Sequence, residues 1–324
     1  MRRALTYNDV NIVPKYSDIE HRDKINISTK LTKKILIDIP IVTSPMDTIT
    51  EYDMALEMMR WGGAGFVHRF MSIDEQVEII SKLKQVSGVN VEILDSPICA
   101  AVGVTGDYLE RAKELVKKGC NVILIDVAHG HHKLVKKAVE EFRNEFGRNV
   151  EIIGGCIATK EATKDLCEWG VDGLRVGVGN GSLCETRIRT GVGLPQVTAL
   201  LDVCSVADGY DVPVIADGGI RNVGDVCKGL GCGADTIMVG SLLSGTKESP
   251  GSIEKKGQWP NEQLFKKYRG SASLDSKLDR GEDENVEGNH KVIPYKGKVK
   301  RIIGDIEDGI RSSCSYVGAS NLEE

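Results

Sequence analysis

The chain has 324 residues, of which 41% are hydrophobic and 27% are charged. This is the balance of a globular protein, so extensive disorder is excluded. The formal net charge of −5 gives no electrostatic reason to bind nucleic acid, and no apolar run is long enough to cross a membrane. The nine cysteines have no CxxC spacing, which argues against a disulfide scaffold and leads us to expect a cytoplasmic protein.

Eight short, nearly continuous apolar runs predict strands that are buried on both faces. These runs are residues 39–43, 63–67, 98–102, 122–127, 151–156, 174–178, 212–216 and 235–239. Amphipathic stretches between them predict helices, the first after the Ser72-x-x-Glu75 capping box and the others over 107–118, 132–146, 160–169, 196–207 and 223–230. Strands that alternate with helices in this way predict an α/β fold, a (β/α)8 barrel. The rival is a doubly wound open sheet, which a GxGxxG after the first strand would favour, and none is present there.

Two segments flank the predicted barrel of residues 38–245. Residues 1–37 are expected to form an extended leader. Residues 246–300 are so polar that they predict either a functional lid or disorder. Residues 300–313 return to a helical pattern. We therefore expect one catalytic domain over residues 1–324, with a mobile flap at about residues 268–295 and a terminal helix.

The active site of such a barrel lies at the carboxyl ends of its strands. Asp217-Gly218-Gly219 follows the seventh run, and Gly240-Ser241 follows the eighth. These two loops form the recurrent phosphate site of the fold, so a bound phosphate is favoured over simple tight turns. Asp217 is then expected beside the phosphate, near ribose hydroxyls, and a structural helix cap is its alternative role.

The loop after the sixth run, residues 177–196, contains five glycines and is expected to form neither helix nor strand. It also contains Cys184, whose neighbours are polar or charged, whereas the other cysteines lie in or beside apolar runs. A cysteine in this position is a candidate nucleophile, with Arg187 favouring the thiolate, and an ordinary loop cysteine is the alternative.

After the fourth run, Asp126 is followed by His129, His131 and His132. Their spacing is not that of a typical metal site, since no HxxxH or HExxH is present. We expect Asp126 to bind a ligand hydroxyl instead.

The run Gly181-Ser182-x-Cys184-x-Thr186-Arg187, followed by Gly191-Val192-Gly193-x-Pro195-Gln196, resembles the catalytic cysteine loop of the IMP dehydrogenase/GMP reductase family. The resemblance extends over nearly the whole chain. The other segments that resemble family motifs are residues 5–10, 44–48, 126–131, 215–221, 238–241 and 268–271. Cys156 and Asn180 depart from the family pattern, which usually has Asn and Pro at these positions.

The resemblance implies a role for each matching residue. Cys184 would form a covalent thioimidate with C2 of the purine, and Thr186 and Glu287 would move protons. The residues implied to bind the substrate are Ser44, Met46, Ser182, Asp217, Gly218, Gly219, Gly240, Ser241, Tyr268, Gly270 and Ser271. Those implied to bind the cofactor are Asp126, Ala128, His129, Gly177 and Gly179. The carbonyls of Gly179, Gly181 and Cys184 resemble a monovalent-cation site, for which K+ is the candidate ion.

Two features resemble the reductase branch of the family rather than the dehydrogenase branch. No regulatory module is inserted at residues 84–95. The flap of the dehydrogenases typically carries an Asp-Arg-Tyr-Phe element that activates water, whereas Asp279-Arg280 in this short flap is followed by Gly281. The resemblance therefore implies an NADPH-dependent GMP reductase that converts GMP to IMP and assembles as a homotetramer. The alternative is an IMP dehydrogenase without the regulatory module, which would oxidise IMP to XMP with NAD. A nucleotide-binding protein without catalysis and a barrel isomerase or lyase are more distant alternatives.

Overall fold

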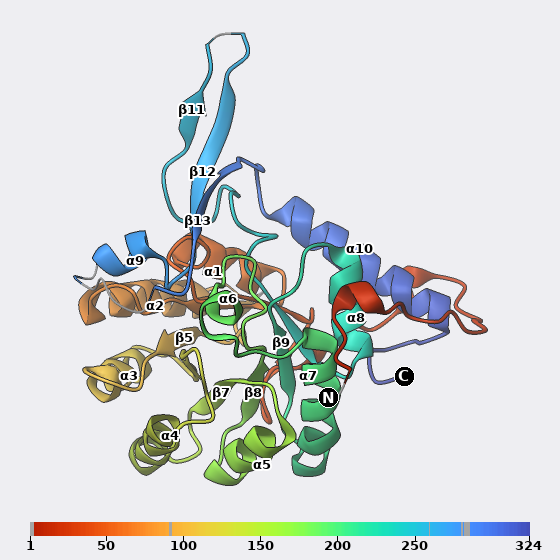
Figure 1. Cartoon of the computed structure of the whole chain (residues 1–324), viewed down its shortest axis with the longest axis horizontal. Coiled ribbons are helices and arrows are strands. Elements are labelled where there is room, and N and C mark those ends of the chain that lie inside the picture. Colours follow the sequence, from red (N-terminus) through yellow and green to blue (C-terminus); the bar gives the residue numbers. More distant parts are fainter. Residues whose placement is uncertain (1–2, 91–92, 259, 280, 282–285) are drawn as a thin grey trace.

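The computed structural model describes residues 3–90, 93–258, 260–279, 281 and 286–324. At its centre, eight parallel strands form a closed barrel, with helices around it (Figure 1). Strands that are consecutive in sequence are neighbours in the barrel, and β10 pairs with β3 to close it. The predicted (β/α)8 barrel is confirmed, and the open sheet is excluded. The barrel strands are β3 (Ile41–Thr43), β4 (Ala64–Val67), β5 (Cys99–Val102), β6 (Val122–Ile125), β7 (Glu151–Ile157), β8 (Gly173–Val176), β9 (Val214–Asp217) and β10 (Thr236–Val239).

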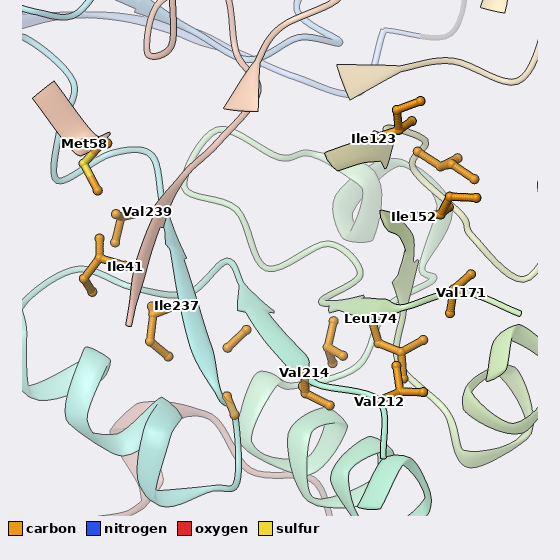
Figure 2. Close-up of a cluster of buried hydrophobic side chains, with 14 of the residues drawn as sticks. Ile41, Met58, Ile123, Ile152, Val171, Leu174, Val212, Val214, Ile237 and Val239 are labelled. Atoms are coloured by element: carbon orange, nitrogen blue, oxygen red, sulfur yellow. The ribbon is translucent and has the colours of Figure 1, made fainter. Parts of the chain in front are cut away.

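The strands are buried on both faces because the barrel has two apolar layers. Val122 and Leu124 of β6 belong to the cluster inside the barrel, whereas Ile123 between them belongs to the cluster under the helices. Figure 2 shows part of this outer cluster, including Ile237 and Val239. Each such side chain contributes roughly 1.5–3 kcal/mol when it is fully buried. Alternation of side chains between two apolar layers explains why the runs read as continuous.

The predicted helices are present, and the Ser72–Glu75 capping box begins α2. Gly119, Gly170 and Gly233, which follow three of the helices, have φ of +107°, +95° and +97°. The helices are α1 (Tyr52–Arg60), α2 (Ile73–Ser87), α3 (Tyr108–Lys117), α4 (Lys133–Phe146), α5 (Lys160–Trp169), α6 (Thr186–Thr190), α7 (Gln196–Ala207), α8 (Val223–Gly231), α9 (Leu274–Leu278) and α10 (Lys300–Val317). Helix α1 was not predicted, and its N-cap residue Glu51 makes no capping bond that could have indicated it. In the part of the chain that the structure describes, no helix is both long and apolar enough to cross a bilayer.

The N-terminal segment is not simply an extended leader. It contains two short 3-10 helices (Tyr7–Asp9 and Arg22–Lys24) and the antiparallel pair β1 (Thr29–Lys30) and β2 (Leu36–Ile37). Leu31 and Ile37 join the cluster inside the barrel, so this hairpin packs against the inner core at the N-terminal ends of the strands. The strands were missed because each has only two residues, too few for a period to be visible.

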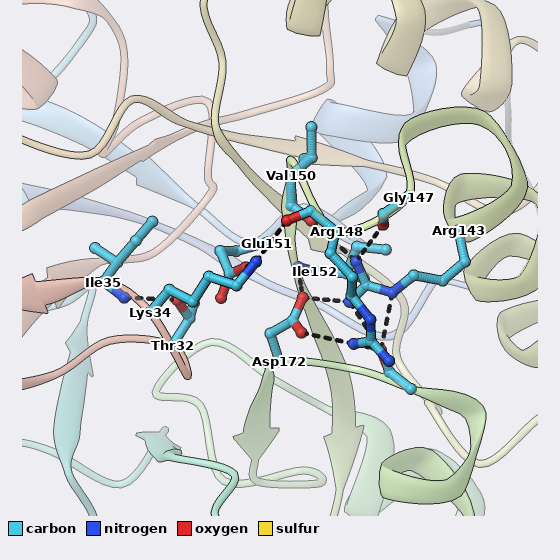
Figure 3. Close-up of polar contacts among 11 residues, drawn as sticks. Thr32, Lys34, Ile35, Arg143, Gly147, Arg148, Val150, Glu151, Ile152 and Asp172 are labelled. Atoms are coloured by element: carbon cyan, nitrogen blue, oxygen red, sulfur yellow. Dashed lines mark hydrogen bonds and ion pairs between the residues drawn. The ribbon is translucent and has the colours of Figure 1, made fainter.

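The hairpin is also attached by polar contacts at the N-terminal end of the barrel (Figure 3). Asp172 accepts the backbone N–H of Ile152 at 2.8 Å and forms ion pairs with Arg143 and, at 3.2 Å, Arg148. Lys34 of the hairpin donates to the carbonyl of Arg148 at 2.6 Å. These contacts saturate the buried carboxylate and join segments far apart in the sequence.

Residues 246–300 were predicted to be either a functional lid or disordered, and their described residues are ordered. They form a three-stranded antiparallel sheet of β11 (Glu254–Lys256), β12 (Gln263–Arg269) and β13 (His290–Pro294), part of which projects from the barrel (Figure 1). Most side chains of this sheet are exposed and many are charged, so no apolar run indicated it. Helix α10 is longer than predicted, and its buried stripe of Ile303, Ile306 and Ile310 lies on the same helix that packs against α8.

Candidate active site

A cavity of about 450 Å³ lies at the carboxyl ends of the barrel strands. It is lined by the loops after β3, β4, β6, β8, β9 and β10 and by the flap, residues 268–295. The structure brings together nearly all residues that the sequence implied, with His129 as the exception. Those at the cavity are Ser44, Met46, Asp126, Ala128, Gly177, Gly179, Gly181, Ser182, Cys184, Thr186, Asp217, Gly218, Gly219, Gly240, Ser241, Tyr268, Gly270, Ser271 and Glu287.

Cys184, Thr186 and Glu287 form a chain of hydrogen bonds at this cavity. The Cys184 thiol donates to Thr186 Oγ1 at 3.2 Å, and the Thr186 hydroxyl donates to Glu287 Oε2 at 2.6 Å. Thr186 begins helix α6, so the expectation that residues 177–196 contain no helix is wrong. The helix was missed because its single turn is hidden between glycine-rich segments. The result is a path along which a proton can move between the sulfur and a carboxylate.

Glu287 is 101 positions from Thr186 in the sequence, and backbone pairing places it there. The N–H of Glu185 donates to the Glu287 carbonyl at 2.7 Å, and the N–H of Asn289 donates to the Leu183 carbonyl at 3.0 Å. The flap thus pairs with the cysteine loop as a short antiparallel bridge. Arg280 and residues 282–285 of the flap lie outside the described residues.

Two of the nine thiols, Cys184 and Cys232, are half-buried rather than buried, and of these two only Cys184 lies at the cavity. Cys184 is half-buried at the cavity, whereas burial raises the pKa of Cys120, Cys156 and Cys204 to about 12. Cys156 also lines the cavity, although only 7% of its surface is exposed. Because the thiolate is the nucleophile, Cys184 is the thiol best placed for covalent chemistry.

Glycine turns form another part of the cavity wall, next to the cysteine loop. Gly218 and Gly219 have φ of +93° and +80°, and successive backbone N–H groups in such conformations can form an anion-binding concavity. A Cβ on Gly240 would lie 3.0 Å from Ser44 Oγ, so a side chain there would crowd the site. The Tyr268 hydroxyl lies 3.2 Å from Ser182 Oγ and joins the flap to this cradle. The residues present therefore fit a phosphate group.

Arg175 is a residue of this site that sequence reasoning missed. Its Nε lies 2.8 Å from Asp217 Oδ2, and its Nη1 lies 2.9 Å from Asp126 Oδ1. Burial lowers the pKa of Arg175, and the two carboxylates more than reverse this effect, so the guanidinium stays charged. A charged residue within the apolar run 174–178 was the available signal. Asp217 is not a helix cap, because Asn222 caps α8.

Arg69 and Phe70, after β4, also line the cavity and were not implied by the sequence. Arg69 Nε lies 3.3 Å from Asp126 Oδ2, and its guanidinium lies over the Phe70 ring, 4.8 Å from the centroid. Asp126 therefore has an arginine on each oxygen. This part of the cavity offers charge, an aromatic face and carboxylates, which fits a nucleotide cofactor.

The histidines that follow Asp126 have local partners. His131 Nε2 lies 2.8 Å from Asp165 Oδ2, His132 caps α4 by accepting the N–H of Leu134, and His129 is exposed. Among the described residues, no three His, Cys, Asp or Glu side chains are grouped as metal ligands.

The carbonyls implied to hold a monovalent cation belong to the cysteine loop. The Gly181 carbonyl accepts the N–H of Cys184 at 3.1 Å, so only its second lone pair is left for an ion. Arg187 packs its aliphatic stem where a Cβ on Gly179 or Gly193 would lie, 2.5 Å away in each case. Carbonyl oxygens suit K+, and the loop can supply them, with that of Gly181 shared.

The fold and the cavity together define a class of protein. It is a (β/α)8 barrel in which a half-buried thiol, a hydrogen-bonded path from that thiol to a carboxylate, and glycine turns surround one cavity. Residues 4–324 match the family model described as the IMP dehydrogenase / GMP reductase domain. The chain belongs to this family, whose members are oxidoreductases of purine metabolism that use a nicotinamide cofactor.

Three relatives illustrate the range of the family. An inosine-5'-monophosphate dehydrogenase of Cryptosporidium parvum is 36% identical, with 99% of this chain and 90% of the relative covered. The inosine-5'-monophosphate dehydrogenase of Nitrosopumilus maritimus is 32% identical, with 100% and 94% covered. A GMP reductase of Leishmania major is 30% identical, with 99% and 92% covered.

Proposed function

We propose that this protein is a GMP reductase that converts GMP to IMP and ammonia with NADPH. The proposal is supported above all by the two hydrogen bonds that connect the Cys184 sulfur through Thr186 to the Glu287 carboxylate. Replacement of a purine 2-amino group by hydrogen needs a nucleophile at C2 and a proton for the departing amine. These three residues supply the nucleophile and the proton within one cavity.

The covalent step follows from the thiol and its partners. The Cys184 proton passes to Thr186 and Glu287, and the thiolate attacks C2 of GMP. The same pair returns a proton to the amino group, which leaves as ammonia when the C2–N bond breaks. The product of this step is a thioimidate between Cys184 and the purine. When hydride reaches C2, the C2–S bond breaks, IMP is released and the thiolate is regenerated.

The cavity walls hold the reacting groups. The turns at Gly218–Gly219 and Gly240–Ser241 bind the 5'-phosphate, and Asp217 binds the ribose hydroxyls. The nicotinamide cofactor is bound by Asp126, Ala128, Arg69 and the Gly177–Gly179 turn. NADPH, when bound, supplies the hydride. Arg175 keeps Asp126 and Asp217 at a fixed separation.

Reduction is favoured over oxidation because the sequence lacks the dehydrogenase water-activating element. No tyrosine occurs between Tyr268 and Tyr295, and Arg280 is followed by glycine. The connection from Ser87 of α2 to Cys99 of β5 is also short, although its residues 91–92 lie outside the described residues. Without activated water the thioimidate is not hydrolysed, and it reacts with hydride instead.

IMP dehydrogenase remains the second candidate because relatives with that name match 99% and 100% of the chain. Thr186 and Glu287 could then activate water for hydrolysis, and NAD would accept the hydride. One assay separates the two. Purified protein is given GMP with NADPH, or IMP with NAD, and the absorbance of the reduced nicotinamide is followed. Oxidation of NADPH with GMP is expected, and activity in the second mixture alone would replace the reductase by the dehydrogenase.

The family resemblance also leads us to propose a homotetramer and activation by K+. Light scattering after gel filtration measures the first. Replacement of K+ by Na+ in the assay measures the second, and a rate unchanged by this exchange would remove the cation from the proposal.

A further inference from the structure

Arg269, at the end of β12, contacts two carboxylates at once. Its Nε and Nη2 lie 2.9 and 2.8 Å from Asp47 Oδ2, and its Nη1 lies 2.5 Å from Asp279 Oδ2. Asp47 belongs to the loop after β3, and Asp279 directly follows helix α9 in the flap. One guanidinium therefore connects the barrel to both ends of residues 269–279.

Asp47 is an unusual partner because it is almost fully buried. Its side chain is 9% exposed, and its Oδ1 is buried without a hydrogen-bond partner among the described residues. A buried carboxylate with an unpaired oxygen is costly unless a cation balances it. Burial lowers the pKa of Arg269, and its two carboxylate partners raise it further than burial lowers it, so the cation persists. The desolvation cost of a buried ion pair can offset its attraction, so this pair is weak evidence for stability. We interpret it as a contact that fixes the position of the flap against the barrel.

The contact between Arg269 and Asp279 closes a loop that supports Glu287. Within this loop, the Ala272 carbonyl accepts the N–H of Glu287 at 3.1 Å, and the Gly270 N–H donates to the Asn289 carbonyl at 2.9 Å. Closing a loop lowers its conformational freedom, so its backbone groups stay in place. The position of Glu287 therefore depends on where residues 270–279 are held.

We propose that Arg269 is a positioning residue for the reaction. By binding Asp47 and Asp279 together, it fixes residues 270–279 against the barrel and thereby holds the Glu287 carboxylate at Thr186. The chemical consequence rests on the proposed function, in which Glu287 moves a proton, whereas the geometric consequence does not.

The main test is Arg269→Gln, assayed with the substrate pair that the wild-type protein turns over. We expect kcat to fall at least about tenfold, because a misplaced proton-transfer group impairs the chemical step. We expect KM for GMP to change less than about threefold, because the phosphate cradle is intact. Hydrogen exchange, read by mass spectrometry on a peptide that contains residues 286–289, should become faster in the variant. This second readout needs no activity.

Three further variants make the test specific. Asp279→Asn removes one of the two contacts at a side chain that is 64% exposed, so folding is not at risk, and it should lower kcat less than Arg269→Gln does. Arg269→Lys keeps the charge and should recover part of kcat. Asp275→Asn, in the same helix, removes a 3.4 Å pair with His290, its one side-chain partner among the described residues, and should leave kcat and exchange unchanged.

Two results would overturn the proposal. One is a kcat within twofold of wild type in folded Arg269→Gln and in Asp279→Asn. The other is a loss of kcat with no faster exchange at residues 286–289. A wild-type protein inactive with both substrate pairs would instead contradict the proposed function, and the exchange measurement would still decide the role of Arg269.

Discussion

Each end of the barrel contains a group of three charged side chains, with the charges reversed between the two ends. At the carboxyl end, one arginine, Arg175, lies between Asp126 and Asp217. At the N-terminal end, one carboxylate, Asp172, lies between Arg143 and Arg148 (Figure 3). The first network faces a cavity, whereas in the second the carboxylate is buried and lines no such cavity, although Arg148 reaches the surface.

The difference lies in the hydrogen-bonding capacity that remains. Asp172 accepts a backbone N–H besides its arginines, and Arg143 also donates to the carbonyls of Gly170 and Val150. Asp126 and Asp217 make ion pairs but still line the cavity, so their oxygens can accept bonds from ligand hydroxyls. We infer that the saturated network serves the stability of the fold, and we expect the unsaturated network at the cavity to bind a ligand.

The largest expected effect at the carboxyl end comes from Cys184→Ala. Without the sulfur no thioimidate forms, so turnover should fall below detection, by at least about a thousandfold. GMP binding, measured by calorimetry, should remain because the phosphate cradle is untouched. Turnover that is unchanged would remove Cys184 from the mechanism.

The second expected effect is selective alkylation. Buried thiols such as Cys120 and Cys156, with pKa raised to about 12, contain on the order of a thousandfold less thiolate than an ordinary thiol at neutral pH. Iodoacetamide should therefore modify Cys184, which is half-buried at the cavity, before these buried thiols, and GMP should protect it. Peptide mapping by mass spectrometry checks this, and equal labelling of Cys156 would contradict the described burial.

A smaller loss of activity is expected from Arg175→Lys. Lysine cannot bind Asp126 and Asp217 in the fixed fork of a guanidinium, so both nucleotide sites lose their alignment. We expect kcat/KM to fall about tenfold to a hundredfold for GMP and NADPH alike. A loss confined to one of the two substrates would show that Arg175 serves only one carboxylate.

The smallest effect on activity is expected at the N-terminal end. Asp172→Asn leaves Arg143 and Arg148 without a carboxylate, so the free energy of unfolding should fall by about 3 kcal/mol. The kcat of the folded variant should stay within about twofold of wild type, because Asp172 precedes β8 at the end of the barrel opposite the cavity and does not line it. Urea unfolding and the GMP assay measure the two quantities. A kcat that fell with stability unchanged would reverse the comparison between the two ends.

The sequence by itself determined the barrel and the identity of the cysteine loop. Buried strands such as β6 and capped helices such as α2 depend on residues that are near one another in the sequence, so periodicity and capping motifs predict them. The resemblance further indicated which residues gather at the cavity, with His129 as the exception.

Only the tertiary structure decided which of these residues act together. Arg175 joins Asp126 to Asp217, and Glu287 reaches Thr186 across 101 positions, through contacts that no local pattern specifies. The same holds for the sheet of β11, β12 and β13, whose exposed, charged strands are defined by pairing rather than by burial. Local preferences select the elements, whereas long-range packing and charge pairing set the distances on which chemistry depends.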